Sequence, residues 1–312
     1  MSTYKILALD GGGIRGAITA ILLERIEKAF PGFIGSADLL AGTSTGGILA
    51  LGLACGLSPT DLKSLYIDRG KAIFYNSLED KIINLGKTLG AEYSSKYLAT
   101  ELKQRFGATT KLKDLRKKVV ITSFDLDNQN PAKRTWKPKI FHNLEGEGSD
   151  GEQLAYKVGL YTSAAPTYFP VAGGFVDGGV FANNPSMIAL LQTQDRRYYA
   201  PPPNLQDLCL LSVGTGETLE FIEGNNLDWG YAQWIWKRRV LSLIMDGTGG
   251  VVDYQCRQIL GEQYYRLNAT FPADKSFPLD AVEPEQIQEL IKVAEAVPIG
   301  EVMKWIEAQW KS

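Results

Sequence analysis

Residues 42–46 read G-T-S-T-G and match the G-x-S-x-G pattern, in which a serine on a sharp strand-to-helix turn acts as a nucleophile. A short apolar run, Ala37 to Ala41, precedes this turn, and the small and aliphatic residues of Gly46 to Leu57 follow it. The motif therefore lies in the context that the chemistry requires. We predict that Ser44 attacks a carbonyl carbon; a glycine-rich helix start without chemistry is the alternative interpretation.

A glycine loop, Gly11 to Gly16, follows the apolar run Tyr4 to Asp10 and fits G-x-G-x-x-G. This pattern is also typical of dinucleotide binding, which needs an acidic residue at the end of the second strand, about 20 residues further on. Asp38 instead precedes the second apolar run. Exposed backbone N–H groups at a helix start can equally stabilise the negative charge of acyl transfer, as an oxyanion hole. We favour that role and expect Arg15 to hold the loop in place.

An aspartate followed by two glycines, Asp177-Gly178-Gly179, ends the short run G-F-V-D and precedes V-F-A-N-N-P. Taken alone, D-G-G is more often a hairpin turn than a catalytic site. Together with a serine elbow and a glycine loop, it offers a carboxylate at the edge of a sheet. Asp177 is therefore the predicted partner of Ser44.

The three motifs in this order resemble the signature of the patatin-like phospholipase family, or bacterial patatins: DGGGxRG, GxSxG, then DGG or DGA. Two further stretches are also similar to the family, TSAAPTYF at 162–169 and GGVFANNP at 178–185. The resemblance spans at least residues 4–215. It implies a lipid acyl hydrolase with a three-layer α/β/α fold, using no metal and no organic cofactor.

The same resemblance implies a Ser-Asp dyad in which Ser44 is the nucleophile and Asp177 its base. It places the oxyanion hole on the amides of Gly11, Gly12 and Gly13. Supporting roles fall to Arg15, Gly16, Gly42, Gly46, Gly178 and Gly179. The only histidine of the chain, His142, lies in a strand-like run with no acid directly beside it, and we leave it out of the site. One histidine is unusual for a catalytic triad and expected for a dyad.

Short apolar runs alternate with helical stretches, which predicts an α/β layer fold with a mainly parallel sheet. Beyond the two runs before the motifs, the expected strands are Lys118 to Phe124, Lys139 to Phe141, Gly174 to Asp177, Leu208 to Val213 and Gln263 to Leu267. We expect one catalytic domain over residues 1–312, its motif-bearing core at about 4–215 and a cap of C-terminal helices at about 284–312, split at Pro298.

Composition is that of an ordinary soluble chain, with 45% hydrophobic and 22% charged residues. Lys plus Arg (33) nearly balance Asp plus Glu (35), for a net charge of −2, which argues against a nucleic-acid partner. The N-terminal residues carry no secretory pattern, so we expect a cytoplasmic protein with peripheral contact at the inner membrane surface. Trp236 to Arg239 (W-K-R-R) suits anionic headgroups or, more often, a helix that packs its aromatic residue inward.

The leading function is thus hydrolysis of fatty acyl esters of membrane lipids, of phospholipase A or lysophospholipase type, through an acyl-enzyme. A carboxylate is a weak base, so the site should desolvate Asp177 and rely on the glycine loop, giving modest turnover without an activator. Alternatives are a neutral-lipid or galactolipid esterase and, by resemblance to some bacterial members, an antiphage phospholipase switched on by a cyclic nucleotide. In another class, the loop at Gly11 to Gly16 serves a nucleotide-binding module.

Overall fold

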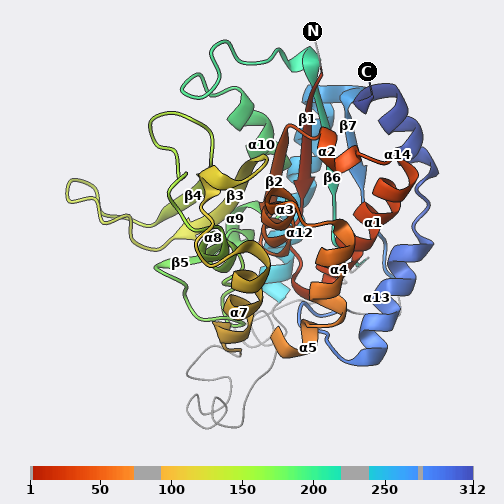
Figure 1. The fold of residues 1–312 in the computed structure, drawn as a ribbon, viewed down its shortest axis with the longest axis horizontal. Helices are drawn as coiled ribbons and strands as arrows, with labels where there is room; N and C mark the ends of the chain where they lie inside the picture. The colour runs from red at the N-terminus through yellow and green to blue at the C-terminus, as the bar shows by residue number, and fades with distance from the viewer. Residues whose placement is uncertain (1–2, 74–92, 219–238, 273–276, 312) are drawn as a thin grey trace, which may run out of the picture.

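The computed structural model describes residues 3–73, 93–218, 239–272 and 277–311. One seven-stranded sheet runs through it in the order β4-β3-β2-β1-β6-β7, with β5 paired to β3 as well (Figure 1). The strands are β1 Tyr4–Leu9, β2 Leu39–Thr43, β3 Lys118–Asp125, β4 Lys137–His142, β5 Phe175–Asp177, β6 Leu208–Val213 and β7 Tyr264–Leu267. Neighbours among β3, β2, β1, β6 and β7 are parallel, whereas β4 and β5 run antiparallel to β3.

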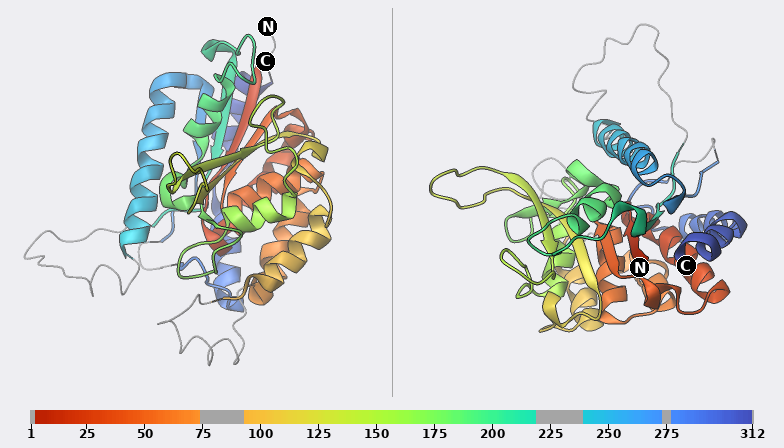
Figure 2. Two further views of the ribbon diagram at one scale, coloured as in Figure 1. Left: turned by 90° about the vertical axis from the view of Figure 1, so that its left-hand side faces the viewer. Right: turned by 90° about the horizontal axis from the view of Figure 1, so that it is seen from above.

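Helices cover both faces of the sheet, and strand alternation assigns each side chain to a face. In β1, Leu7 and Leu9 belong to the core cluster that includes α1 and α3, whereas Ile6 and Ala8 belong to the cluster under α10 and α12. Figure 2 shows α12 and the red-to-orange helices on opposite sides of the sheet. The molecule is therefore a three-layer α/β/α fold with a mostly parallel central sheet, as the alternation of the sequence predicts.

Helices connect most of the strands and follow the last one. They are α1 Gly16–Ala29, α2 Phe33–Ser36, α3 Thr45–Cys55, α4 Pro59–Ile67, α5 Gly70–Ile73, α7 Ser95–Phe106, α8 Ala155–Thr162, α9 Gly179–Ala182, α10 Ser186–Thr193, α12 Arg239–Leu260, α13 Pro284–Ala296 and α14 Gly300–Trp305. Short 3₁₀ turns are η1 Gly13–Arg15, η3 Leu112–Asp114, η4 Leu205–Asp207 and η5 Gly261–Gln263, and a π-helical turn, Ile306–Trp310, ends the chain. Trp236 and its basic neighbours up to Arg238 lie outside the described residues.

Within the part of the chain that the structure describes, no helix has the length and apolar character needed to cross a membrane. The buried helix α3 illustrates why, since it is apolar on all sides but only 11 residues long.

Candidate active site

The register of three strands brings the serine and aspartate motifs together. β2 pairs with the first part of β3, ending at Thr43 opposite Thr122, and β5 pairs with the rest of β3, so that Asp177 lies opposite Ser123. Because β4 lies along the other side of β3, β2 and β5 share one side of that strand and meet end to end. Ser44, the residue after β2, therefore lies beside the last residue of β5.

Ser44 occupies a strained turn between β2 and α3. Its backbone has φ 55° and ψ −124°, a conformation that residues other than glycine rarely adopt. The turn is so tight that only glycine fits at two positions. A Cβ on Gly42 would overlap the Gly46 carbonyl, and one on Gly46 would overlap the Leu9 carbonyl. The Ser44 amide donates to Thr162 Oγ1 at 2.8 Å, which fixes the turn from the side of α8. These contacts present the hydroxyl above the sheet.

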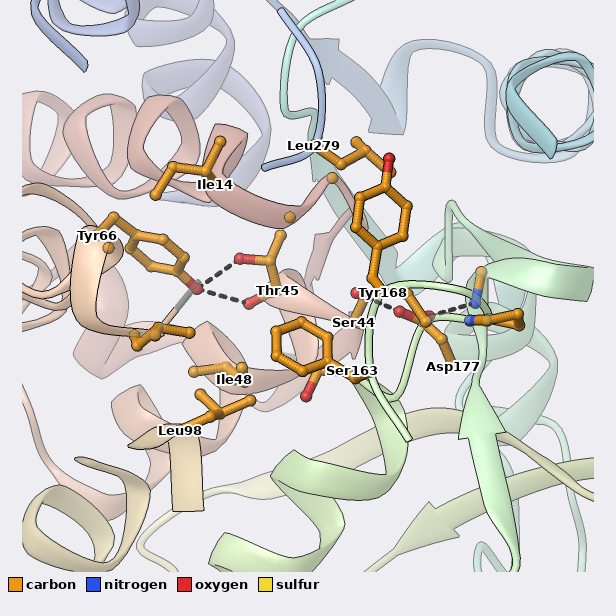
Figure 3. Close-up of a pocket in the computed structure, with 18 of the residues that line it drawn as sticks. Ile14, Ser44, Thr45, Ile48, Tyr66, Leu98, Ser163, Tyr168, Asp177 and Leu279 are labelled. Carbon is orange, nitrogen blue, oxygen red and sulfur yellow. Dashed lines mark hydrogen bonds between the residues drawn. The ribbon is translucent and has the colours of Figure 1, made fainter. Parts of the chain in front are cut away.

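The Ser44 hydroxyl donates a hydrogen bond of 2.5 Å to Asp177 Oδ2 (Figure 3). The other carboxylate oxygen, Oδ1, accepts the Gly179 amide at 2.7 Å. Both side chains are buried. Burial raises the pKa of Asp177 from 3.8 to about 6, although the hydrogen bonds from Ser44 and Gly179 oppose that rise. The carboxylate is therefore a better proton acceptor than an exposed aspartate, as the sequence led us to expect.

The glycine loop lies at the start of η1 and α1, next to Ser44. The amide of Gly11 donates to the Asn183 carbonyl at 3.0 Å, so this amide is already engaged. Gly12 and Gly13 line the same cavity as Ser44, and among the described residues neither amide donates a hydrogen bond to a backbone carbonyl outside the regular helices and strands. Arg15 Nε approaches the Gly12 carbonyl at 3.4 Å. Of the three loop amides expected to form the oxyanion hole, that of Gly11 is engaged with Asn183, whereas Gly12 and Gly13 line the cavity beside Ser44.

The remaining glycines of the motifs are places of close approach rather than chemistry. A Cβ on Gly16 would overlap Thr45 Oγ1, and one on Gly178 would overlap Thr122 Oγ1. Both contacts allow α1 and the aspartate turn to pack directly against the strand ends around Ser44. Gly179 contributes through its amide instead, as the donor to Asp177.

An apolar cavity opens beside the dyad. Figure 3 shows Ile14, Ile48, Tyr66 and Leu98 on one side of Ser44 and Asp177 on the other. The wall includes the side chains of Ile14, Ile48, Leu65, Tyr66, Ile73, Leu98, Tyr168, Phe169, Val180, Met245 and Leu279. A cavity with this apolar lining suits an apolar chain whose reactive carbonyl lies at Ser44.

Sequence reasoning did not identify two polar side chains within this cavity. Thr45 Oγ1 donates to the Tyr66 hydroxyl at 2.5 Å, and that hydroxyl donates to the Thr45 carbonyl at 3.2 Å. The pair thereby satisfies its own polar atoms in an apolar wall. Only the position of Thr45 beside the nucleophile could have suggested it, because Tyr66 lies on α4 without a motif. His142 lies on β4, its ring against Tyr198, and does not line the cavity.

Comparison with known proteins agrees with this arrangement. The family described as patatin-like phospholipase matches residues 7–190, which include all three motifs. The chain belongs to the patatin-like phospholipase family. It is therefore a serine hydrolase that acts on acyl lipids, with patatin-like phospholipase activity.

Individual relatives in this family include bacterial and mammalian proteins. A "cGAMP-activated phospholipase" of Pseudomonas aeruginosa is 33% identical over 293 residues, covering 90% of this chain and 83% of the relative. A protein of the same name from Escherichia coli is 37% identical over 229 residues, 68% of this chain and 62% of the relative. The "85/88 kDa calcium-independent phospholipase A2" of Rattus norvegicus is 30% identical, covering 86% of this chain and 36% of that protein.

Proposed function

We propose that this patatin-like phospholipase cleaves fatty acyl esters of membrane phospholipids through Ser44 and Asp177, and that a cyclic dinucleotide activates it. The hydrolytic part rests on one observation, the 2.5 Å hydrogen bond between Ser44 Oγ and Asp177 Oδ2 at the edge of an apolar cavity. The activation part is supported by the bacterial relatives named cGAMP-activated phospholipase, one of which aligns with 90% of this chain.

In the proposed reaction, Ser44 Oγ attacks the ester carbonyl while its proton passes to Asp177 Oδ2. The carbonyl oxygen becomes negatively charged and accepts hydrogen bonds from the amides of Gly12 and Gly13. Collapse of this intermediate breaks the bond to the lysolipid oxygen, which takes the proton from Asp177 and leaves. Water then attacks the acyl carbonyl while Asp177 takes its proton. The bond from the acyl carbon to Ser44 Oγ breaks, Asp177 returns the proton to Ser44, and the fatty acid is released.

The cavity supports a lipid rather than a small polar ester as substrate. Its wall is almost entirely aliphatic and aromatic. Among its polar side chains besides the dyad, Thr45 and Tyr66 are hydrogen-bonded to each other, and Ser163 Oγ donates to the Gly159 carbonyl at 2.7 Å. A fatty acyl chain gains free energy by leaving water for such a surface, at about 25 cal/mol per Å² of apolar area. A polar headgroup gains no comparable free energy from contact with this apolar surface.

The test is release of fatty acid, measured by mass spectrometry, from vesicles of phosphatidylethanolamine and phosphatidylglycerol. The protein is assayed alone, with cGAMP, and with ATP as a control nucleotide. We expect slow release alone and at least tenfold faster release with cGAMP only. Ser44→Ala and Asp177→Asn should each reduce activated release by about 10³-fold or more. His142→Phe keeps the ring contact with Tyr198 and should retain activity.

The outcomes separate the parts of the proposal. Equal release with and without cGAMP would remove the activation step and leave the hydrolase. Release from galactolipid or triacylglycerol but not from phospholipid would replace the substrate class. Loss of activity in His142→Phe, with Asp177→Asn still active, would contradict the dyad.

A further inference from the structure

A buried ion pair lies directly beneath the glycine loop. Asp10, the residue before Gly11, is 3% exposed, and its Oδ2 accepts a hydrogen bond of 2.5 Å from Arg266 Nη2 on β7. Arg266 Nη1 also donates to Ser212 Oγ on β6 at 2.8 Å. Neither charged residue lines the cavity, so neither contacts an acyl chain there.

The sheet itself builds this contact. Ala8 on β1 pairs with Ser212 on β6, and Ser212 pairs with Arg266 on β7, so the three residues form a row across the sheet. Asp10 follows Ala8 by two residues, which gives its side chain the same face. Arg266 therefore reaches across β6 to a carboxylate at the carboxyl end of β1. A lysine at 266 would bring one ammonium in place of this two-armed contact.

A negative charge at Asp10 is unfavourable for the reaction unless it is neutralised. The carboxylate lies two residues before Gly12, whose amide donates to the developing oxyanion in the proposed mechanism. In a buried site such a charge opposes the developing oxyanion far more than it would in water. Arg266 places a positive charge on the opposite side of the same carboxylate and holds it beneath the loop.

We propose that Arg266 is a positioning residue for hydrolysis, which neutralises Asp10 and fixes the start of the glycine loop so that the amides of Gly12 and Gly13 can stabilise the oxyanion. This inference rests on the proposed function of Ser44 and the loop. Arg266 lies beyond residues 7–190, the stretch that the family comparison matches.

Other contacts hold the loop without any charge. Thr215 Oγ1 donates to the Gly11 carbonyl at 2.8 Å, and the Ile14 amide donates to the Leu279 carbonyl at 2.8 Å. The loop should therefore survive loss of Arg266, and the damage should follow the charge of Asp10. Two further titratable groups act on the pair, Asp253 of α12 and Tyr264 of β7, which are bonded to each other at 2.9 Å.

The test is the pH dependence of kcat on a short soluble ester from pH 6.5 to 9 in Arg266→Met. Burial raises the pKa of Asp10 and the guanidinium opposes that rise, so in Arg266→Met the carboxyl group ionises at higher pH than in wild type, and its uncompensated charge forms as the pH rises. We expect kcat to be about tenfold to a hundredfold below wild type at pH 9, with a deficit that shrinks toward pH 7. KM should stay unchanged, since the cavity is intact.

Two companion variants make the test specific. Asp10→Asn combined with Arg266→Met carries no charge to titrate, so its kcat should stay within about tenfold of wild type and lose the alkaline fall. Arg266→Lys keeps the positive charge beside Asp10, so its kcat should also stay within about tenfold of wild type and show no alkaline fall. Arg134→Met removes an arginine from the exposed pair with Asp127, away from Asp10 and Arg266, and is the matched control, expected to match wild type.

A folded Arg266→Met enzyme with wild-type kcat at pH 9 would overturn the inference. So would a deficit that is equal at every pH and persists in the double variant, because that result describes a structural role alone. If Arg266→Met does not fold, the double variant decides, and a loss above a hundredfold in it counts against the inference. Wild-type activity in Ser44→Ala would instead remove the proposed function on which the inference rests.

Discussion

Asp177 must be ionised to accept the proton of Ser44, and its burial makes ionisation harder. Its pKa is raised to about 6 by desolvation. We therefore predict that kcat/KM for a short soluble ester rises with pH through about 6 and reaches a plateau near pH 7 to 8. The measurement is a pH profile from 4.5 to 8 with a substrate that does not itself titrate. Full activity retained down to pH 4.5 would show that Asp177 is not the base.

The same burial should lower the free energy of unfolding at neutral pH, where Asp177 is ionised. Between pH 4 and 6 the folded protein retains a proton that the unfolded chain has released, so the free energy of unfolding falls as pH rises through this window. A shift of about two pKa units corresponds to a loss of up to about 3 kcal/mol at pH 7. We predict that Asp177→Asn unfolds at higher urea concentration than wild type at pH 7, and that this gain disappears near pH 4. A variant less stable than wild type at pH 7 would contradict this account.

At the scale of elements, the strand and helix positions could be predicted because each is encoded locally. Apolar runs bounded by glycine mark the strands, and three motifs mark the turns that carry Ser44 and Asp177. The way in which β2 and β5 meet along β3 could not be predicted, since pairing register depends on residues far apart in the chain. The alternation of strands and helices likewise did not predict that two strands, β4 and β5, run antiparallel to their neighbour β3.

Contacts that join distant elements were also beyond sequence reasoning. The Gly11 amide donates to the Asn183 carbonyl, a contact that depends on how the aspartate turn packs against the loop. Neither Tyr66 nor Arg266 belongs to a motif. Tyr66 contacts Thr45 from α4, and Arg266 contacts Asp10 from β7. Motifs identify residues that react, whereas residues that position them are set by packing.

The helices that wall the cavity should determine which acyl chains fit. Leu98 on α7 is 4% exposed and lines the cavity on the side of Ser44 away from Asp177 (Figure 3). We predict that Leu98→Trp fills this space, lowering kcat/KM for long-chain esters at least tenfold while short-chain esters are cleaved within about twofold of wild type. Leu191→Trp, on α10 and 58% exposed, is the matched control. An equal loss for both chain lengths would mean that Leu98 does not limit chain length.

At the scale of the whole molecule, the C-terminal segment packs against the first helices of the chain. Trp310 is fully buried, its ring 4.8 Å from that of Phe33, and its Nε1 donates to Ser36 Oγ at 2.8 Å. Arg25 Nη1 on α1 donates to the Ala294 carbonyl at the end of α13 at 2.7 Å. These contacts couple the last 30 residues to the layer that carries the glycine loop, and we propose that the chain folds as one cooperative unit.

Trp310→Ala tests that coupling. Loss of a buried tryptophan typically lowers the free energy of unfolding by about 3–5 kcal/mol, through lost transfer free energy and the cavity that remains. If the C-terminal helices belong to the same unit as the catalytic core, urea unfolding should show one transition shifted as a whole, with ester hydrolysis lost at the same concentration as helical circular dichroism. Trp136→Ala, at a side chain 69% exposed, should shift that transition by less than about 1 kcal/mol. A separate early transition in Trp310→Ala, with hydrolysis persisting beyond it, would place the C-terminal helices outside the catalytic unit.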